Sequence, residues 1–535
     1  MHALTGVSLL VVAAVLAVTP PAAGQQTWPQ TAPELTGHRE TTRYDDVVAF
    51  MTDVAARSPL IRLTSFGYSF EGRSLPLAVV GHVADATPEA VRAAGRTVVY
   101  VQGNIHGGEV EGKESALMLL RDIAQGRHAE WLDSLVLLVA PIYNADGNER
   151  VRLTNRPYQH GPIGGMGQRP NAQGYDLNRD HMKLDSPEAR SLALLLRAYD
   201  PHVGIDLHTT NGTHHGYELT YSPPLHPNTD PAIIGFLRDA WLPTVNGNLA
   251  EYGGETYYYG NVQGEGDARG WYTFDHRPRF NNNYLGLRNR FAILSEAYSY
   301  ATFADRIDAT SRFLVQVLDF AWRNAREVRR IVAAADAVDV TGRDLAVRAE
   351  HERAAMPSDI LMGGVVEERN PYSGAVMLRR TRERRVERMP EYGTFAATET
   401  ARAPVAYLVP AERTELIALL EAHGVRMAAL PEARAVRVER FVIDSTWTAT
   451  REFQGHRERT ATGRYEALET TVPAGTLVVP VGQTLGRLAF MLLEPRSDDG
   501  ALNWNVLDRV LEGAWTHWPV LRTDEPLPTS GESGR

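Results

Sequence analysis

The sequence contains no cysteine among its 535 residues. Disulfides, thiolate catalysis, cysteine-ligated metal sites and lipid attachment through an N-terminal cysteine are therefore excluded. Lysine is almost absent as well, since Lys113 and Lys183 are the only two, a skew to which we attach no functional weight. Without disulfides, the chain must be stabilised by its hydrophobic core, and its length permits a large one.

Long apolar runs are also missing. The run Gly6–Val18 is about 13 residues long, whereas a membrane-spanning helix needs about 20. The small residues Ala22, Ala23 and Gly24 follow it, although only His2 precedes it as a chargeable group. The pattern predicts a signal peptide over residues 1–25 and a secreted or periplasmic protein, with no lipoprotein cysteine and no membrane span after leader removal.

Composition and charge narrow the class of protein further. Apolar residues make up 43% and charged residues 22%, which is typical of a globular chain. The 55 basic and 65 acidic residues give a net charge of −10, which predicts no nucleic-acid partner. A chain of 535 residues is too long for one ordinary domain, so we expect two. Nothing in the sequence indicates the oligomeric state.

Apolar, β-branched runs alternate with helical patterns between about residues 40 and 325. Helical spacing is clear in Gly112–Ala124 and Pro187–Ala198. This alternation predicts an α/β fold with a mixed, largely parallel sheet and helices on both faces. The expected strands are Thr97–Ile105, Leu135–Tyr143, His202–Leu207, Tyr217–Tyr221 and Phe291–Ser295.

The chain divides into successive parts on the same reasoning. We predict a first domain over 26–325, a connecting helix over 326–345, and an α/β or β-rich C-terminal accessory region over 346–522. A disordered tail is predicted over 523–535. The long amphipathic pattern Ser311–Val338 predicts one helix closing the first domain, and Tyr158–Gln173, rich in Gly, Pro and Gln, predicts a long loop.

Three potential metal ligands follow predicted strands. His106 and Glu109 come directly after Thr97–Ile105, with two glycines between them that ease a sharp turn. His208 follows the strand His202–Leu207, and the nearby Asp206 is a candidate to orient its imidazole, although the sequence does not decide where it points. Because ligands gather at the carboxyl ends of strands in such sheets, these residues are candidates for one site.

Glu296 interrupts the apolar strand Phe291–Ser295 at its end. Burying a carboxylate there is costly, so it needs a partner, a metal ion or a catalytic use. Two histidines and a glutamate leave zinc an open position for water, and a further carboxylate can serve as general base. Asn178 and Arg179, preceded by Arg169 near the end of the long loop, offer donors that suit a carboxylate.

In this order, His106/Glu109, Arg169, Asn178/Arg179, His208 and Glu296 resemble the M14-type zinc carboxypeptidases. The resemblance covers roughly residues 40–320 and says nothing firm about the C-terminal region. It implies one zinc ion held by three ligands, Glu296 as the general base toward a metal-activated water, and Arg169 steadying the oxyanion. Asn178 and Arg179 would hold the free C-terminal carboxylate of a peptide substrate.

Two family features are not matched. Tyr272 and Tyr284 straddle the spacing expected of a mobile tyrosine, and Tyr257–Tyr259 lie further off. The polar, uncharged Asn281–Asn283 argues against a pocket for basic side chains. A zinc amidase or deacylase of N-acyl amino acids is the alternative within hydrolases, and a non-catalytic binding protein of the same fold is the alternative outside them.

Overall fold

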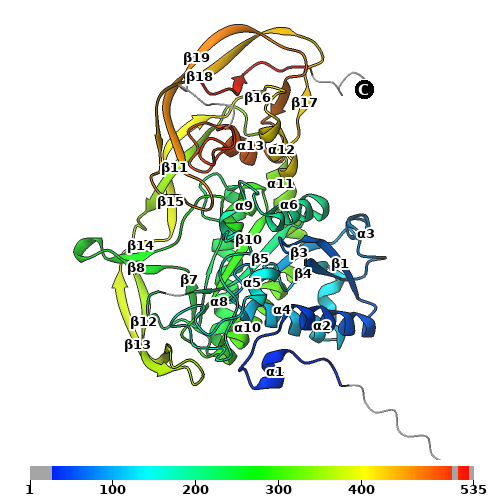
Figure 1. Ribbon diagram of the computed structural model, residues 1–535, viewed down its shortest axis with the longest axis vertical. Coiled ribbons are helices and arrows are strands. Elements are labelled where there is room, and N and C mark those ends of the chain that lie inside the picture. The colour runs from blue at the N-terminus through cyan, green and yellow to red at the C-terminus, as the bar shows by residue number, and fades with distance from the viewer. Residues whose placement is uncertain (1–26, 211, 509–515, 529–535) are drawn as a thin grey trace, which may run out of the picture.

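A mixed eight-stranded sheet forms the centre of the first domain. The computed structural model describes residues 27–210, 212–508 and 516–528 (Figure 1). The strand order is β1-β2-β4-β3-β5-β10-β6-β7. The middle strands β4, β3, β5 and β10 run parallel. The pairs β1–β2, β2–β4 and β6–β10 are antiparallel, and β7 runs parallel to β6. The strands are β1 (Ile61–Tyr68), β2 (Ser74–Val80), β3 (Thr97–Gly103), β4 (Leu135–Ala140), β5 (Val203–Thr210), β6 (Leu219–Ser222), β7 (Thr256–Tyr258) and β10 (Phe291–Tyr298).

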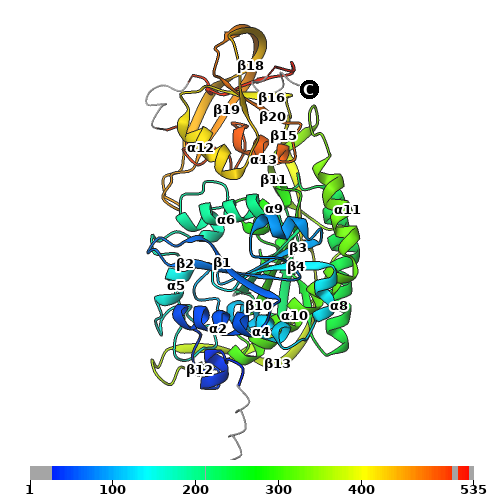
Figure 2. The same ribbon diagram turned by 90° about the vertical axis from the view of Figure 1, so that its right-hand side faces the viewer.

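Helices cover both faces of this sheet, as the alternating pattern predicted. Figure 2 shows α2 (Tyr44–Arg57), α4 (Glu111–Ala124) and α10 (Phe303–Arg323) on one side, with α6 (Pro187–Tyr199) and α9 (Asn281–Leu287) on the other. Every residue of β3, β4 and β5 is buried, which explains why apolar residues dominate β3 and fill β4. The remaining helices of the domain are α1 (Ala32–Thr36), α3 (Pro88–Ala93), α5 (Ala145–Glu149), α7 (Pro231–Phe236) and α8 (Leu242–Glu251).

The single helix predicted over Ser311–Val338 is wrong, because two helices meet there. Helix α10 ends at Arg323 and α11 (Ala325–Asp336) begins after Asn324, whose φ of −112° is not helical. The Asn324 amide Nδ2 donates to the carbonyl of Phe320 at 2.9 Å and so satisfies the end of α10. Within the predicted connecting segment 326–345, the helix ends at Asp336 and β11 starts at Asp344.

The C-terminal region is rich in β-strands. Its main sheet has six strands in the order β17-β20-β16-β21-β18-β19, accompanied by α12 (Thr414–His423) and α13 (Gly486–Leu493). The predicted end of the region, residue 522, falls inside β21. The strands are β16 (Ala406–Val409), β17 (Ala428–Ala429), β18 (Arg434–Thr448), β19 (Arg459–Val472), β20 (Leu477–Pro480) and β21 (Leu521–Thr523).

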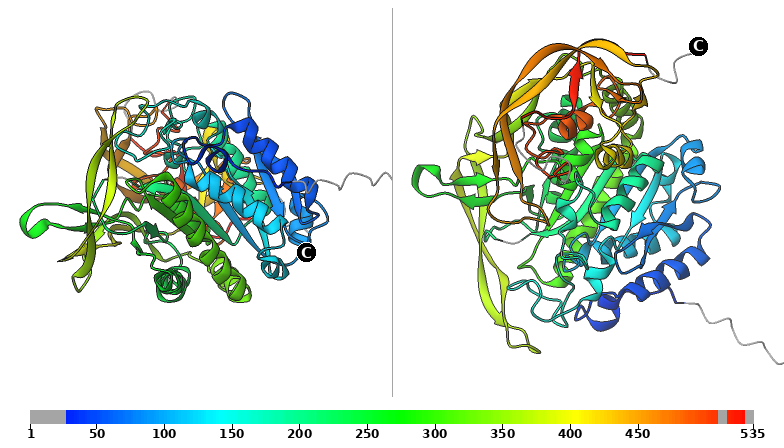
Figure 3. Two further views of the ribbon diagram at one scale, coloured as in Figure 1. Left: turned by 90° about the horizontal axis from the view of Figure 1, so that it is seen from below. Right: turned by 45° about the horizontal axis from the view of Figure 1, so that its top comes forward.

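The segment before this sheet folds back along the first domain. The hairpin of β12 (Ser358–Arg369) and β13 (Val376–Met389) runs beside that domain in Figures 1 and 3. Isolated bridges join it to Tyr158 and His215, and β14 (Glu391–Tyr392) pairs with β9 (Gly270–Tyr272). Two further strands, β11 (Asp344–Glu352) and β15 (Thr394–Arg402), pair with each other, and β8 (Asn261–Gln263) pairs with β9.

One hydrophobic core runs through both parts of the chain. It extends from Val47, in α2, to Val520, next to the last described strand. Buried ion pairs also join the parts: Arg279 lies 2.8 Å from Asp499, and Arg487 lies 2.9 Å from Asp230. The C-terminal region therefore shares its core with the first domain.

The ends of the chain fall partly outside the described residues. The leader predicted over residues 1–25 lies outside them, as do residues 529–535 of the predicted tail. Thr523, the first residue of that tail, is buried in β21. In the described part of the chain, no helix has the length and apolarity that a bilayer crossing requires.

His423 of α12 makes contacts between the two parts of the chain that we expect to be sensitive to acid. Its Nδ1 lies 2.8 Å from the hydroxyl of Tyr284 and its Nε2 lies 3.0 Å from the carbonyl of Met182. Burial lowers the pKa of His423 to about 3. Because the unfolded chain binds this proton near pH 6.5, stability falls as the pH drops from there, by about 1.4 kcal/mol per unit.

His423→Gln is therefore expected to have a lower melting temperature than wild type at pH 7.5, because the contacts of His423 are lost. Between pH 7.5 and pH 4.5, however, its melting temperature should fall by less than that of wild type. The protonation cost removed at pH 4.5 is about 3 kcal/mol. Calorimetry across this pH range tests the prediction, with the exposed His82→Gln as a control that keeps the wild-type pH dependence. Equal falls for His423→Gln and wild type would contradict it.

Candidate metal centre and active site

His106 and Glu109 lie in the turn between β3 and α4. The Glu109 amide donates to the His106 carbonyl at 2.9 Å, which closes the turn. Gly107 and Gly108 are needed because other backbone passes close by: a Cβ on Gly107 would lie 2.4 Å from the carbonyl carbon of Gly147. Any side chain at these two positions would push the turn away from the loop behind it.

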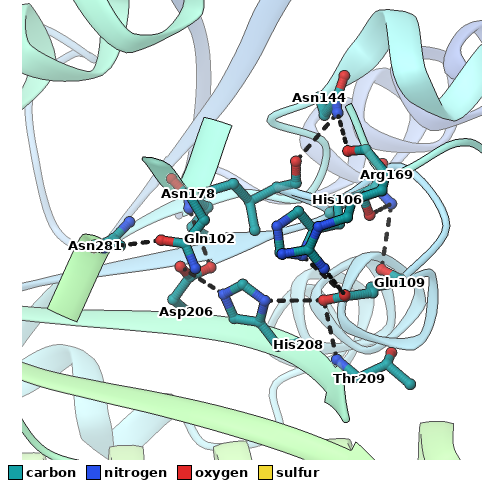
Figure 4. Close-up of polar contacts among 12 residues, drawn as sticks. Gln102, His106, Glu109, Asn144, Arg169, Asn178, Asp206, His208, Thr209 and Asn281 are labelled. Atoms are coloured by element: carbon teal, nitrogen blue, oxygen red, sulfur yellow. Dashed lines mark hydrogen bonds and ion pairs between the residues drawn. The ribbon is translucent and has the colours of Figure 1, made fainter. Parts of the chain in front are cut away.

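The sheet brings His208 and Glu296 to the same place. They are register partners on the parallel strands β5 and β10. His106, Glu109 and His208 each offer a ligand atom, and these three atoms lie within 4.8 Å of one another. Glu109 Oε1 is 2.8 Å from His106 Nδ1, and Glu109 Oε2 is 2.9 Å from His208 Nδ1 (Figure 4).

A carboxylate lies close to the Nε2 atom of each imidazole. His208 Nε2 lies 2.9 Å from Asp206 Oδ2, although the two atoms do not meet in hydrogen-bond geometry. His106 Nε2 lies 2.9 Å from Asp176 Oδ1, a contact that sequence reasoning missed. Metal-ligating histidines commonly donate their second N–H to a carboxylate. Two nitrogen donors, one carboxylate and this support fit a zinc ion.

The acids of the site have shifted pKa values. Burial alone would raise the pKa of Glu109, but the charges of His106 and Arg156 outweigh it and hold that pKa well below its usual value. Burial raises the pKa of Glu296 to about 8, and the negative charge of Glu109 adds to this rise. In the described residues, Glu296 Oε2 has no hydrogen-bond partner. Glu296 as a whole is half-buried, but this oxygen is shielded from solvent and is available to exchange a proton.

Three arginines surround these acids. Arg169 lies 2.8 Å from Asp176 and 3.7 Å from Glu109. Arg156, which sequence reasoning missed, lies 2.8 Å from Glu109 Oε1 and donates to the Thr209 carbonyl at 3.1 Å. Arg156 lies just before the long loop predicted over Tyr158–Gln173, and no motif marks it. The third arginine, Arg179, lies 3.9 Å from Asp176. The three guanidinium groups bring positive charge to the candidate site.

Asn178 and Arg179 lie on the adjoining wall. Asn178 Oδ1 accepts a hydrogen bond of 2.9 Å from the backbone N–H of Asn281, so the Asn178 side chain is held in one orientation. The Arg179 guanidinium carbon lies 3.9 Å from the centre of the Phe280 ring. This stacking, together with a hydrogen bond of 2.8 Å from Arg179 Nη1 to the Asn178 carbonyl, holds the guanidinium at the cavity.

A cavity of about 210 Å³ gathers all seven predicted site residues. Tyr259 also lines it, and burial raises the pKa of its hydroxyl to about 12. Tyr272 and Tyr284 do not line this cavity, and Asn281–Asn283 are buried in α9. Its wall consists of His106, Glu109, Arg156, Arg169, Asn178, Arg179, His208, Thr209, Thr210, Tyr259, Phe274, Phe280, Leu294 and Glu296.

The fold and this site define a metal-dependent hydrolase domain. Residues 47–276 match the zinc carboxypeptidase family model, and that match includes the three candidate ligands, Arg169, Asn178 and Arg179. Carboxypeptidase 2 of Trichophyton tonsurans is 23% identical over 492 residues, covering 87% of this chain and 84% of the relative. The similarity to this fungal protein therefore extends into the C-terminal region. Residues 47–276 are thus similar to zinc carboxypeptidase domains, and the chain is a zinc metallopeptidase of the carboxypeptidase type.

More distant similarities cover only part of the chain. Human carboxypeptidase D is 29% identical over 201 residues, which are 33% of this chain and 14% of the human protein. A metallo-carboxypeptidase structure from Burkholderia cenocepacia has a TM-score of 0.41 at 16% identity, covering 53% of this chain and 70% of the other.

Proposed function

We propose that the chain hydrolyses the C-terminal peptide bond of peptides, with one zinc ion held by His106, Glu109 and His208. The register pairing of Glu296 with His208 supports this most, because it fixes a half-buried carboxylate beside the candidate ligands. A zinc ion there would polarise the scissile carbonyl and lower the pKa of a water molecule.

In this proposal Glu296 takes the proton of the attacking water and passes it to the leaving amine. A divalent cation nearby would lower its pKa from about 8 and so favour the ionised form at neutral pH. Arg169 stabilises the negative charge that develops on the carbonyl oxygen, because its guanidinium already reaches toward Glu109.

Charge in the cavity favours an anionic substrate end. Three arginines and two glutamates line it, so a divalent cation would make the lining positive overall. Asn178 and Arg179 would hold the terminal carboxylate, the arginine through paired donors. The aromatic rings of Phe274 and Phe280 beside them suit an apolar C-terminal side chain better than a basic one.

The substrate class is tested with an N-blocked dipeptide, its C-terminal amide and an N-acyl amino acid, each before and after chelation and zinc return. We expect chelation to abolish cleavage and the free dipeptide to be the best substrate. Arg179→Ala should lower kcat/KM for the free dipeptide about 100-fold, toward the value for the amide. Equal cleavage of free and amidated dipeptides would contradict the proposal, and cleavage of the N-acyl amino acid alone would indicate a deacylase.

We also propose that the protein is exported, on the strength of the apolar run Gly6–Val18. An intact-mass measurement on protein isolated outside the cytoplasm tests this, because loss of residues 1–25 is the expected result.

A further inference from the structure

A strained turn of the C-terminal region reaches the candidate metal centre. Phe453 and His456 exchange backbone hydrogen bonds of 2.7 and 3.0 Å, which closes a two-residue turn in the segment between β18 and β19. The two central residues, Gln454 and Gly455, have φ values of 53° and 79°. Such turns favour Asn, Asp or Gly at the first central position. A glutamine held there with positive φ is costly, and costs of this kind cluster at functional sites.

The Gln454 side chain contacts the residue that supports a candidate zinc ligand. The backbone N–H of Asp176 donates to Gln454 Oε1 at 2.7 Å. The carboxylate of Asp176 in turn contacts His106 Nε2 at 2.9 Å and Arg169 at 2.8 Å. Gln454 is therefore one residue removed from both a candidate ligand and the arginine proposed to stabilise the oxyanion.

Neighbouring contacts hold the turn against the first domain. His456 Nε2 lies 2.7 Å from Asp185, and Glu458 lies 2.6 Å from Arg279. The guanidinium carbon of Arg279 also lies 5.5 Å from the centre of the Phe453 ring. Because these contacts lie on either side of Gln454, its carboxamide is held in place against Asp176.

We propose that Gln454 is a positioning residue, through which the C-terminal region fixes Asp176 and thereby the orientation of His106 toward zinc. This rests on the proposed zinc site. The C-terminal region is then part of the metal centre's support, and a first domain produced without it would bind zinc more weakly.

The full-length chain offers a test in which stability and function move in opposite directions. Gln454→Gly removes the contact and also relieves the left-handed backbone, so the melting temperature should stay the same or rise. The apparent zinc dissociation constant, measured by chelator competition, should rise about fivefold, somewhat less than the roughly 10- to 100-fold typical when a direct partner of a ligand is lost. Gln454→Glu keeps an acceptor for the Asp176 N–H and should bind zinc within about twofold of wild type.

Asn505→Gly is the matched control. Asn505 also has a positive φ, 60°, in the C-terminal region, but it does not line the cavity. The Asn505→Gly variant should therefore bind zinc with the affinity of wild type. Unchanged zinc affinity in Gln454→Gly, or a loss in Gln454→Glu equal to that in Gln454→Gly, would overturn the inference. A wild-type chain that binds no zinc would instead overturn the proposed function, so the two failures are distinct.

Discussion

Glu296→Gln is expected to retain zinc and to lose activity by about 10²- to 10⁴-fold in kcat, the contribution usual for a general base. The amide has nearly the same size as the carboxylate but cannot accept the proton of water. The three candidate ligands are left intact, because within the described residues none of them is hydrogen-bonded to Glu296. Steady-state kinetics on the blocked dipeptide, with elemental analysis of the same sample, measure both quantities.

Glu494→Gln serves as the control for this substitution. Glu494 is a buried glutamate whose pKa is likewise raised by burial, but it contacts Tyr465 and Tyr407 in the C-terminal region and does not line the cavity. It should keep wild-type kcat. If Glu296→Gln kept more than about a tenth of the activity, Glu296 would not be the base.

The sheet could be predicted because its strands are buried on both faces. Runs dominated by apolar residues, such as those of β3 and β4, leave few alternatives to a covered parallel sheet. The helix break at Asn324 could not be predicted in the same way, since the amphipathic pattern continues across it. Only the side-chain contact of Asn324 with the Phe320 carbonyl distinguishes two helices from one.

The sequence also indicated where the site residues gather. Each predicted ligand follows a strand, and parallel strands end at one edge of the sheet. The contacts of Asp176 and Arg156 with the candidate ligands could not be predicted, for a different reason. Their partners, His106 and Glu109, are about 70 and 47 residues away, and no local pattern reports such a pairing.

The C-terminal region was the least predictable part. Its strands β12 and β13 are largely exposed and carry many charged residues, so they lack the clear alternation of a half-buried sheet. Their return to the first domain depends on tertiary contacts with Tyr158 and His215. The contact of Gln454 with Asp176 spans 278 residues and is likewise visible only in the folded chain.

His208→Ala is expected to lose zinc and, with it, activity. Apparent binding free energies of zinc sites are at least about 10 kcal/mol, so one of three protein ligands contributes about 3 kcal/mol or more. The zinc dissociation constant should therefore rise at least about 100-fold. Elemental analysis after dialysis against a weak chelator, together with circular dichroism, checks metal content and folding on the same sample.

Loss of folding must be separated from loss of the ligand, because His208 also lies between Glu109 and Asp206. Removing it takes away the charged partner of the buried Asp206, while Glu109 keeps Arg156, and breaking one buried pair costs about 3–5 kcal/mol. His208→Asn keeps a polar group in this position and should remain folded while still failing to hold zinc. His226→Ala removes a buried histidine that does not line the cavity, and it should keep one zinc per chain. Full zinc occupancy in folded His208→Asn would show that the metal is not bound here.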